Sequence, residues 1–209
     1  MSSAPRSLAL VGMSGVGKSF CAKRLAARGY RRHDCDGAIA ARLSEIVAAQ
    51  PGEEPVNALG RWMGMPWTEG YAAREARYLA LEEEVTREAL VATARDASEP
   101  HVVDTTGSVI YLPGELLADL GRTARVVYLC APDAHRDKLL ARYLAHPKPI
   151  VWGASWPAGG TEADLPRAYG ELLAFRDARY RALAHVELEG GALDREHPDL
   201  DGFLARAFA

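Results

Sequence analysis

Residues 12–19 read Gly-Met-Ser-Gly-Val-Gly-Lys-Ser and match the phosphate-binding pattern G-x-x-x-x-G-K-[S/T] in full. The apolar run SLALV (7–11) precedes this segment, and the helical pattern KSFCAKRLAAR follows it. In that setting, glycines let backbone N–H groups curl around phosphate oxygens, and the start of the helix adds a partial positive charge. The segment therefore predicts a strand, a phosphate-binding loop and a helix at the start of an α/β domain.

The residues of this loop are expected to hold a nucleotide and its metal ion. Lys18 is expected to reach the β- and γ-phosphates, and the Ser19 hydroxyl to bind Mg²⁺. ATP and Mg²⁺ are thus the expected cofactors. The predicted nucleotide contacts are Gly12, Ser14, Gly15, Val16, Gly17, Lys18, Ser19 and Phe20.

Four further short runs follow the first one, and helical patterns separate them. The runs at 7–11, 101–105 and 125–130 are nearly continuous in apolar residues, as expected for parallel strands covered on both faces. The remaining strands are predicted at 31–35 and 185–189, and helices at 18–28, 36–50, 69–97, 113–120, 132–144 and 165–185. This alternation predicts a single α/β domain over 1–209 with a parallel sheet flanked by helices.

Two stretches, 51–70 and 145–164, do not fit a minimal sheet with helices. Each contains two tryptophans among glycines and prolines. Structureless loops of this length in a compact domain are usually lids or binding flaps, and packing of the tryptophans beneath the loops is the alternative. We expect a small substrate-binding insertion at about 37–70 and a lid at about 143–164.

Composition excludes several classes of protein. A formal net charge of −3 argues against a nucleic-acid binder that works by bulk charge. The three cysteines lack C-x-x-C spacing, so neither a zinc site nor a disulfide framework is indicated. No apolar run approaches the length of a membrane span. We expect a cytoplasmic protein that contacts neither nucleic acid nor membrane and is a monomer or a weak homodimer.

Acidic residues follow the second and third predicted strands. Asp34 and Asp36 leave an extended strand on the same side, where one carboxylate can hold the Mg²⁺ shell and the other can take a hydroxyl proton. Capping of the following helix by Asp36 is the alternative. Asp104 ends the third strand and is expected to touch the Mg²⁺ sphere. The predicted metal residues are therefore Ser19, Asp34 and Asp104.

A phosphate-binding loop by itself leaves several classes of nucleotide-binding protein open. Recognition of guanine by GTPases needs N-K-x-D, but Asn57 is the only asparagine and Ala58 follows it. Motor ATPases and transporters typically need a longer chain. The remaining class is the small kinases that phosphorylate metabolites or nucleotides.

Over most of its length the sequence resembles the shikimate kinase family. The resemblance rests on GMSGVGKS, on the Asp34/Asp36 pair, on the stretch Tyr71–Arg74–Glu75 and on LLAFRDARYRALAHVEL near the C-terminus. It implies a five-stranded parallel sheet of order 2-3-1-4-5 with a mobile lid. It also implies that Asp36 contacts the acceptor hydroxyl as a base and that Asp34 orients the Mg²⁺ water shell. Arg74 and Arg176 would hold the acceptor's carboxylate.

Two stretches differ from the pattern of that family. The run Asp104-Thr105-Thr106-Gly107-Ser108 stands where the family has three glycines against the acceptor ring, and we expect Thr106 and Gly107 to contact the acceptor. The Arg-Pro region of the family lid is matched loosely by 146–149. Arg136, Arg142 or Lys148 is expected to close over the phosphates, and Arg142 is the predicted catalytic arginine beside Lys18 and Asp36.

The sequence thus predicts transfer of the γ-phosphoryl group of Mg·ATP to a hydroxyl of a small, anionic, shikimate-like metabolite. A nucleoside or nucleotide kinase would share the phosphate loop and the acidic pair. A non-catalytic ATP-binding regulator would bind ATP without acceptor-dependent release of ADP. Both alternatives stay open at this point.

Overall fold

A single five-stranded sheet organises the computed structural model, which describes residues 7–44, 47, 52–53, 55–131, 136–145, 150–190 and 199–209. Its order is β2-β3-β1-β4-β5, and every pair of neighbours is parallel. The strands are β1 (Leu8–Val11), β2 (Arg31–Asp34), β3 (His101–Asp104), β4 (Arg125–Cys130) and β5 (Val186–Glu189). This arrangement confirms the predicted α/β fold and the strand order 2-3-1-4-5.

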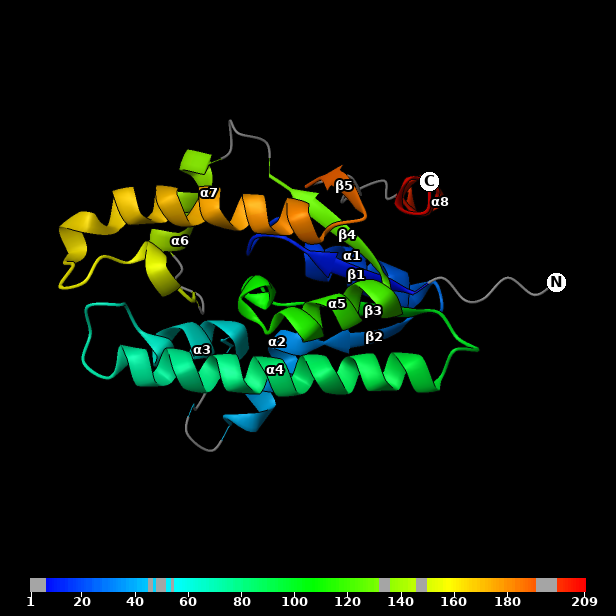
Figure 1. The fold of residues 1–209 in the computed structure, drawn as a ribbon, viewed down its shortest axis with the longest axis horizontal. Coiled ribbons are helices and arrows are strands. Elements are labelled where there is room, and N and C mark those ends of the chain that lie inside the picture. Colours follow the sequence, from blue (N-terminus) through cyan, green and yellow to red (C-terminus); the bar gives the residue numbers. More distant parts are fainter. Residues whose placement is uncertain are drawn as a thin grey trace.

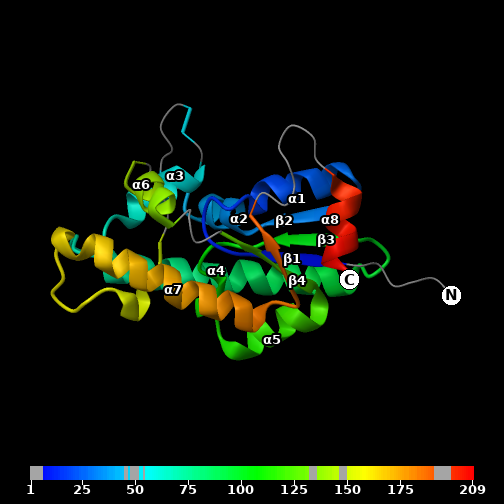
Figure 2. The same ribbon diagram turned by 90° about the horizontal axis from the view of Figure 1, so that it is seen from above.

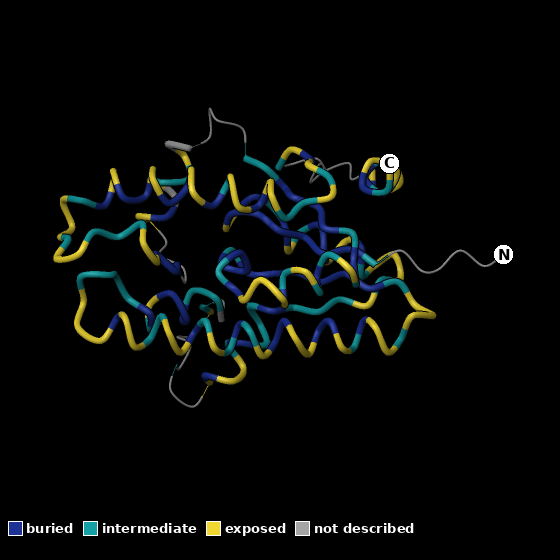
Figure 3. Tube along the Cα trace, in the orientation of Figure 1, coloured by how far each residue is buried: buried dark blue, intermediate teal, exposed yellow. Residues whose placement is uncertain are grey.

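Burial along the strands follows their place in the sheet. All residues of the central strands β1 and β3 are buried, whereas β2, which pairs only with β3, is partly exposed. The charged sequence Arg31–Asp34 suits such an edge strand. Figure 3 shows the buried trace running through the strands while the outer sides of the helices are exposed.

Eight α-helices lie in the part of the chain that the structure describes. They are α1 (Lys18–Ala27), α2 (Cys35–Arg42), α3 (Pro55–Met63), α4 (Tyr71–Arg95), α5 (Gly114–Thr123), α6 (Arg136–Ala145), α7 (Leu165–Leu183) and α8 (Leu200–Ala207). Helices α1 and α8 cover one face of the sheet, and α4, α5 and α7 cover the other (Figures 1 and 2). None of the helices in the described residues is long and apolar enough to cross a membrane.

The predicted loops and helices need three corrections. Residues 51–70 were expected to lack secondary structure, but α3 occupies Pro55–Met63 and buries Ala58, Leu59 and Met63. The helix expected at 36–50 is the shorter α2, which ends at Arg42. Helix α8 was not predicted. It buries Leu200, Phe203 and Ala207 at helical spacing, a signal that was present in the sequence.

The loops that follow the strands meet at the carboxyl edge of the sheet. Helices α3 and α6 and the first half of α7 extend beyond this edge (Figure 1). Residues 150–164 add two single-turn 3₁₀ helices, η3 (Gly153–Ser155) and η4 (Glu162–Asp164). In an open parallel sheet this edge is where ligands bind, so the residues there form the candidate site.

Candidate active site

The loop between β1 and α1 has the backbone geometry of a phosphate cradle. Gly12, Gly15 and Gly17 have φ angles of 142°, 88° and 105°. At Gly12 a Cβ atom would also stand 2.6 Å from the Leu129 carbonyl oxygen, so only glycine fits. Gly17 is the N-cap of α1 and offers no side-chain cap, and the first turn contains no acidic residue. The N–H groups at the start of α1 are therefore suited to anionic oxygens.

The predicted nucleotide residues differ in how far they are buried. Lys18 is buried and donates from Nζ to the carbonyl oxygens of Gly12 (2.8 Å) and Met13 (3.1 Å), so its ammonium lies over the loop. Ser14, Gly15 and Ser19 are exposed, whereas Val16 is packed in the core and Phe20 is half-buried.

The predicted metal residues Ser19, Asp34 and Asp104 are brought together at the carboxyl ends of β2 and β3. The Ser19 hydroxyl lies 3.4 Å from Asp104 Oδ1. Arg32, which the sequence analysis missed, donates from Nε (3.1 Å) and Nη2 (2.6 Å) to Asp104 Oδ2 and lies 3.1 Å from Asp34 Oδ2. Its position two residues before Asp34, on the same face of an extended strand, was the available signal.

The donor set at this cluster fits Mg²⁺, because hydroxyl and carboxylate oxygens are its preferred ligands. No group of three or more His, Cys, Asp or Glu side chains within the described ranges has the arrangement of a metal site. Mg²⁺ usually binds through one or two carboxylates together with phosphate oxygens and waters, and not in an all-protein cage. Ser19 with Asp104 and Asp34 meets that requirement.

Asp36 stands in the first turn of α2, and Asp34 caps that helix by accepting from the Gly37 N–H at 3.0 Å. The alternative that Asp36 is the cap is therefore wrong. Burial raises the pKa of Asp36 to about 6, with Lys18 opposing the shift and Asp104 and Asp34 adding to it. The Tyr78 hydroxyl lies 3.4 Å from Asp36 Oδ1. A carboxyl group with a pKa near 6 is suited to accept a proton near neutral pH.

A buried polar cluster lies below this carboxyl group. Glu82 is fully buried on α4 and accepts hydrogen bonds from the hydroxyls of Thr106 and of Ser108, the latter at 2.6 Å. Burial raises the pKa of Glu82 to about 7, and the two hydroxyl donors oppose that shift. The Thr106 hydroxyl is thus directed at Glu82, and its predicted role as a contact to the acceptor stays a prediction.

Arg176 reaches the same edge from α7. It is 3% exposed, donates from Nη2 to the Val151 carbonyl oxygen at 2.7 Å and lies over the Tyr111 ring with its Cζ 5.4 Å from the centroid. Its Nε has no hydrogen-bond partner among the described residues. A Cβ atom on Gly107 would stand 3.4 Å from Arg176 Nη1 and 3.4 Å from the Ser14 backbone nitrogen, so this glycine separates the arginine from the phosphate loop.

Several solved structures are similar in fold to this chain. A shikimate kinase from Acinetobacter baumannii in complex with shikimate aligns with a TM-score of 0.61 and 22% identity over 96% of this chain and 91% of its own. The chain has the fold of the shikimate kinases. The enzyme from Bacteroides thetaiotaomicron aligns with a TM-score of 0.58 and 18% identity, covering 96% of this chain and 95% of its own. The shikimate kinase from Aquifex aeolicus aligns with a TM-score of 0.54 and 16% identity, covering 95% of this chain and 94% of its own. No protein-family model and no curated protein matches the sequence.

Within this shikimate kinase fold, Arg74 contacts main-chain groups at the loop between α3 and α4. Its Nε donates to the Met63 carbonyl oxygen at 3.0 Å, and its Nη2 donates to that of Glu69 at 3.0 Å. The guanidinium is enclosed by the loop between α3 and α4, because a Cβ atom on Gly70 would stand 2.8 Å from Nη1. These contacts assign Arg74 to holding that loop.

The segment expected to act as a lid is partly anchored. The Tyr71 hydroxyl lies 2.7 Å from both Glu75 Oε1 and the Ile150 carbonyl oxygen, and Glu75 Oε1 accepts from the Trp152 N–H at 2.7 Å. Trp152 is buried against Tyr169 of α7. The side chains of Arg136 and Arg142 on α6, and the whole of Lys148, lie outside the described residues.

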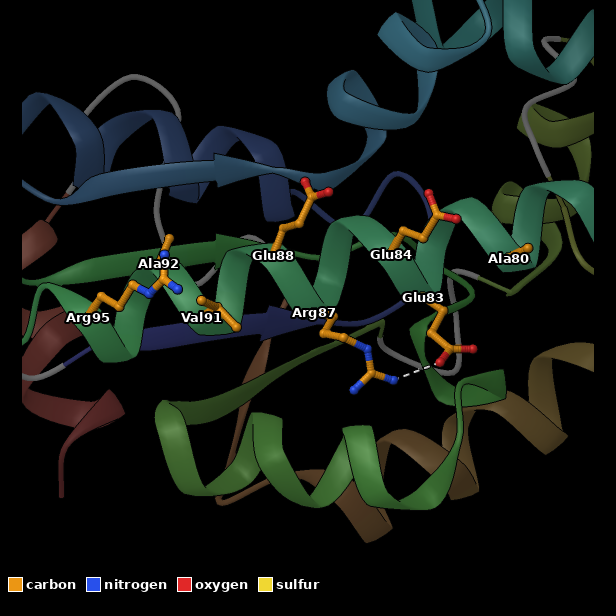
Figure 4. Close-up of a pocket in the computed structure, with 8 residues that line it drawn as sticks. All are labelled: Ala80, Glu83, Glu84, Arg87, Glu88, Val91, Ala92 and Arg95. Carbon is orange, nitrogen blue, oxygen red and sulfur yellow. Dashed lines mark hydrogen bonds and ion pairs between the residues drawn. The ribbon is translucent and has the colours of Figure 1, made fainter.

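One surface hollow lies apart from this site. It has a volume of about 680 Å³, and its lining residues all belong to α4 (Figure 4). One wall is an ordinary i, i+4 ion pair, Glu83 with Arg87 at 2.7 Å. A hollow lined by one exposed helix face does not enclose a ligand, so we do not place the active site there.

Proposed function

We propose that this protein is a kinase that transfers the γ-phosphoryl group of Mg·ATP to a hydroxyl of a small anionic metabolite. The observation that carries the proposal is the position of Gly107 between Arg176 and the Ser14 backbone nitrogen. An acid group held by Arg176 lies only a residue's width from the phosphate loop. That proximity is what a phosphoryl acceptor requires.

The proposed site residues divide the chemical work. Lys18 and the N–H groups at the start of α1 bind the phosphates and balance their negative charge. Asp36 accepts the proton of the acceptor hydroxyl, and its pKa, raised to about 6, suits a base near neutral pH. Arg176 binds the acceptor's acid group through planar N–H donors.

Ser19 and Asp104, together with Asp34, would hold Mg²⁺. When bound, the ion supplies charge neutralisation at the transferred phosphoryl group. We further propose that Arg142 closes over the phosphates while the anchored segment 150–153 stays in place, which excludes water and limits hydrolysis of ATP.

The acceptor is proposed to be shikimate-like. The similar structure from A. baumannii contains shikimate, which makes that compound the first to try. Thr106 and Ser108 bring hydroxyl groups to the loop after β3, and Glu82 fixes both of them. The preferred acceptor can therefore differ somewhat in shape from shikimate, and such compounds belong in the test beside it.

Release of ADP from Mg·ATP, measured with a panel of acceptors, tests the proposal. The panel holds shikimate, other hydroxy acids, cyclitols, sugars and nucleosides. A hydroxy acid that stimulates release in the wild type, but not in Asp36→Asn or Lys18→Ala, supports the proposal. Lys23→Ala, an exposed lysine on the same helix, is the matched control and should keep full activity.

Other outcomes assign a different function. Stimulation by nucleosides alone makes the protein a nucleoside kinase. ATP binding without stimulation by any acceptor makes it a nucleotide-binding regulator. Full activity of Lys18→Ala contradicts the proposed mechanism.

A further inference from the structure

The guanidinium group of Arg32 lies between two of the carboxylates that are proposed to serve Mg²⁺. It donates two hydrogen bonds to Asp104 Oδ2, at 2.6 Å and 3.1 Å, and its Nη2 lies 3.1 Å from Asp34 Oδ2. The proposed function does not use this arginine. Its charge nevertheless meets the same oxygens that a divalent cation would approach.

The strand register explains why a positive charge is needed there. Asp34 and Asp104 are paired directly across β2 and β3. Paired residues of neighbouring strands share a face and lie only about 5 Å apart, so two ionised carboxylates there repel each other. Arg32 precedes Asp34 by two residues and so reaches the same face. The side chain of Asp104 is 3% exposed, which leaves it little solvation of its own.

Most of the lone-pair directions of these carboxylates are already in use. Asp34 Oδ1 accepts from the Gly37 N–H, and its Oδ2 faces Arg32. Asp104 Oδ2 accepts both Arg32 bonds, whereas its Oδ1 lies 3.4 Å from the Ser19 hydroxyl. Of these groups, Asp104 Oδ1 and the Ser19 hydroxyl contact neither the arginine nor the Gly37 N–H, and they are a small donor set for a divalent ion.

We propose that Arg32 is a resident cation that prevents Mg²⁺ from binding alone, so that the ion enters only together with nucleotide phosphates. The proposal rests on the proposed function, because it concerns the same metal residues. Arg32 is a positioning residue: it holds Asp34 and Asp104 in register. It leaves Asp104 Oδ1 and Ser19 for direct contact with the ion, and Asp34 would act through the water shell of the ion. Phosphate oxygens then complete the coordination that these two groups cannot supply.

A dependence of metal binding on nucleotide could also arise if free ions could not reach the site, but the structure shows a route to Asp34. Arg32 and Asp34 both line a groove of about 410 Å³ between β2 and α4. Free ions can reach the Asp34 carboxylate from this groove, so the charge of Arg32 is the barrier that the proposal invokes.

Binding of Mn²⁺ to the nucleotide-free full-length protein, followed by the loss of the free-ion EPR signal, tests the inference. We expect no binding to the wild type at submillimolar Mn²⁺ and at least a tenfold tighter Kd for Arg32→Gln. Arg32→Lys keeps the charge and should resemble the wild type. Arg31→Gln is the matched control, because Arg31 is its neighbour on β2 and forms an exposed ion pair with Asp96 at 3.2 Å.

Equal Mn²⁺ affinities of the wild type and Arg32→Gln, or equal gains in Arg31→Gln and Arg32→Gln, overturn the inference. Arg32→Met keeps the stem without the charge and serves where Arg32→Gln is unstable. For that variant the readout is the melting temperature. Mg²⁺ should raise it by several degrees in Arg32→Met and leave the wild type unchanged, and equal shifts overturn the inference.

The arm with nucleotide separates the two proposals. Wild-type protein that binds Mn²⁺ only when ATP is present supports the dependence on nucleotide. Failure to bind ATP at all contradicts the proposed kinase function. The comparison of Arg32→Gln with the wild type, made without nucleotide, still decides the role of the arginine in that case.

Discussion

The Nη1 atom of Arg176 and the Cα of Gly107 are so close that a methyl group on the glycine would stand 3.4 Å from the arginine. The same methyl group would stand 3.4 Å from the Ser14 nitrogen of the phosphate loop. Gly107 therefore sets the width of the gap between the proposed acid-binding arginine and the phosphates. The hydroxyl of Tyr180 donates to the Gly107 carbonyl oxygen, which fixes this part of the loop.

Gly107→Ala should raise the KM for the acceptor about tenfold or more and leave the fold intact. The added Cβ would stand in van der Waals contact with Arg176 and Ser14, and would occupy space between the proposed acid-binding arginine and the phosphate loop. Steady-state kinetics with each substrate varied in turn measure the effect. Gly114→Ala, where a Cβ atom meets nothing within 4 Å, is the control. An unchanged KM for the acceptor in Gly107→Ala would show that the acceptor does not bind beside Gly107.

Arg176→Ala should change mainly the KM for the acceptor, and Arg74→Ala should change mainly the stability. Arg176→Ala should raise the KM for the acceptor by roughly 10²-fold, because a hydrogen bond to a charged group contributes about 1.5–3 kcal/mol. Arg74→Ala should lower the melting temperature by several degrees and leave that KM nearly unchanged, since its donors bind carbonyl oxygens of the loop between α3 and α4. Calorimetry and kinetics on both variants decide the matter. If Arg74→Ala raises the KM for the acceptor without loss of stability, Arg74 binds the acceptor.

Turnover should depend on the ionisation of Asp36. Its pKa of about 6 lies above the ordinary value for an aspartate, so the carboxyl becomes protonated as the pH falls through 6. A protonated Asp36 cannot accept the acceptor's proton, and kcat/KM should therefore fall about tenfold per pH unit below that point. A pH–rate profile measures this limb. A profile that is flat from pH 5 to 8 would exclude Asp36 as the base.

Glu82 should make the protein more stable in mild acid than at neutral pH. Its pKa rises from 4.5 to about 7 on folding, so the native state binds its proton more tightly than the unfolded chain does. This contribution is complete below pH 4.5 and is lost as the pH rises through 7. Glu82→Gln should remove a slope of roughly 2–4 kcal/mol in the free energy of unfolding between pH 5 and 8. Urea denaturation measures it, with the exposed Glu84→Gln as the control; equal slopes in both variants would contradict the assignment.

The sheet could be predicted because its signals are local. The apolar runs of β1, β3 and β4 and the phosphate loop each lie within one short segment, and the family resemblance implied the strand order. Helix α3 was missed because the flanking prolines and glycines favoured a loop, although Val56, Leu59 and Met63 recur at helical spacing. Its stability comes from packing against α2 and α4, and such contacts do not show in a local pattern.

The site was predictable to the extent that its residues follow strands. Asp34 and Asp104 end β2 and β3, and the register brings them together as expected. Arg32, Tyr78 and Glu82 were missed because their roles depend on which face of a strand or helix meets the cluster. The role of Arg74 toward the acceptor stays a prediction, and its donors contact carbonyl oxygens near its own helix, which the sequence did not indicate.

The anchoring of residues 150–153 bears on how this site can change during evolution. Ile150, Val151 and Trp152 are held through their main-chain groups, by Tyr71, Arg176 and Glu75 respectively. A carbonyl oxygen is present whatever side chain the position carries, and an N–H is present in every residue except proline. Apolar substitutions of similar size at the buried positions 150 and 151 can therefore accumulate without releasing Arg176, provided that the backbone path is kept. Diversification of the preferred acceptor would then fall to the side chains of the loop after β3.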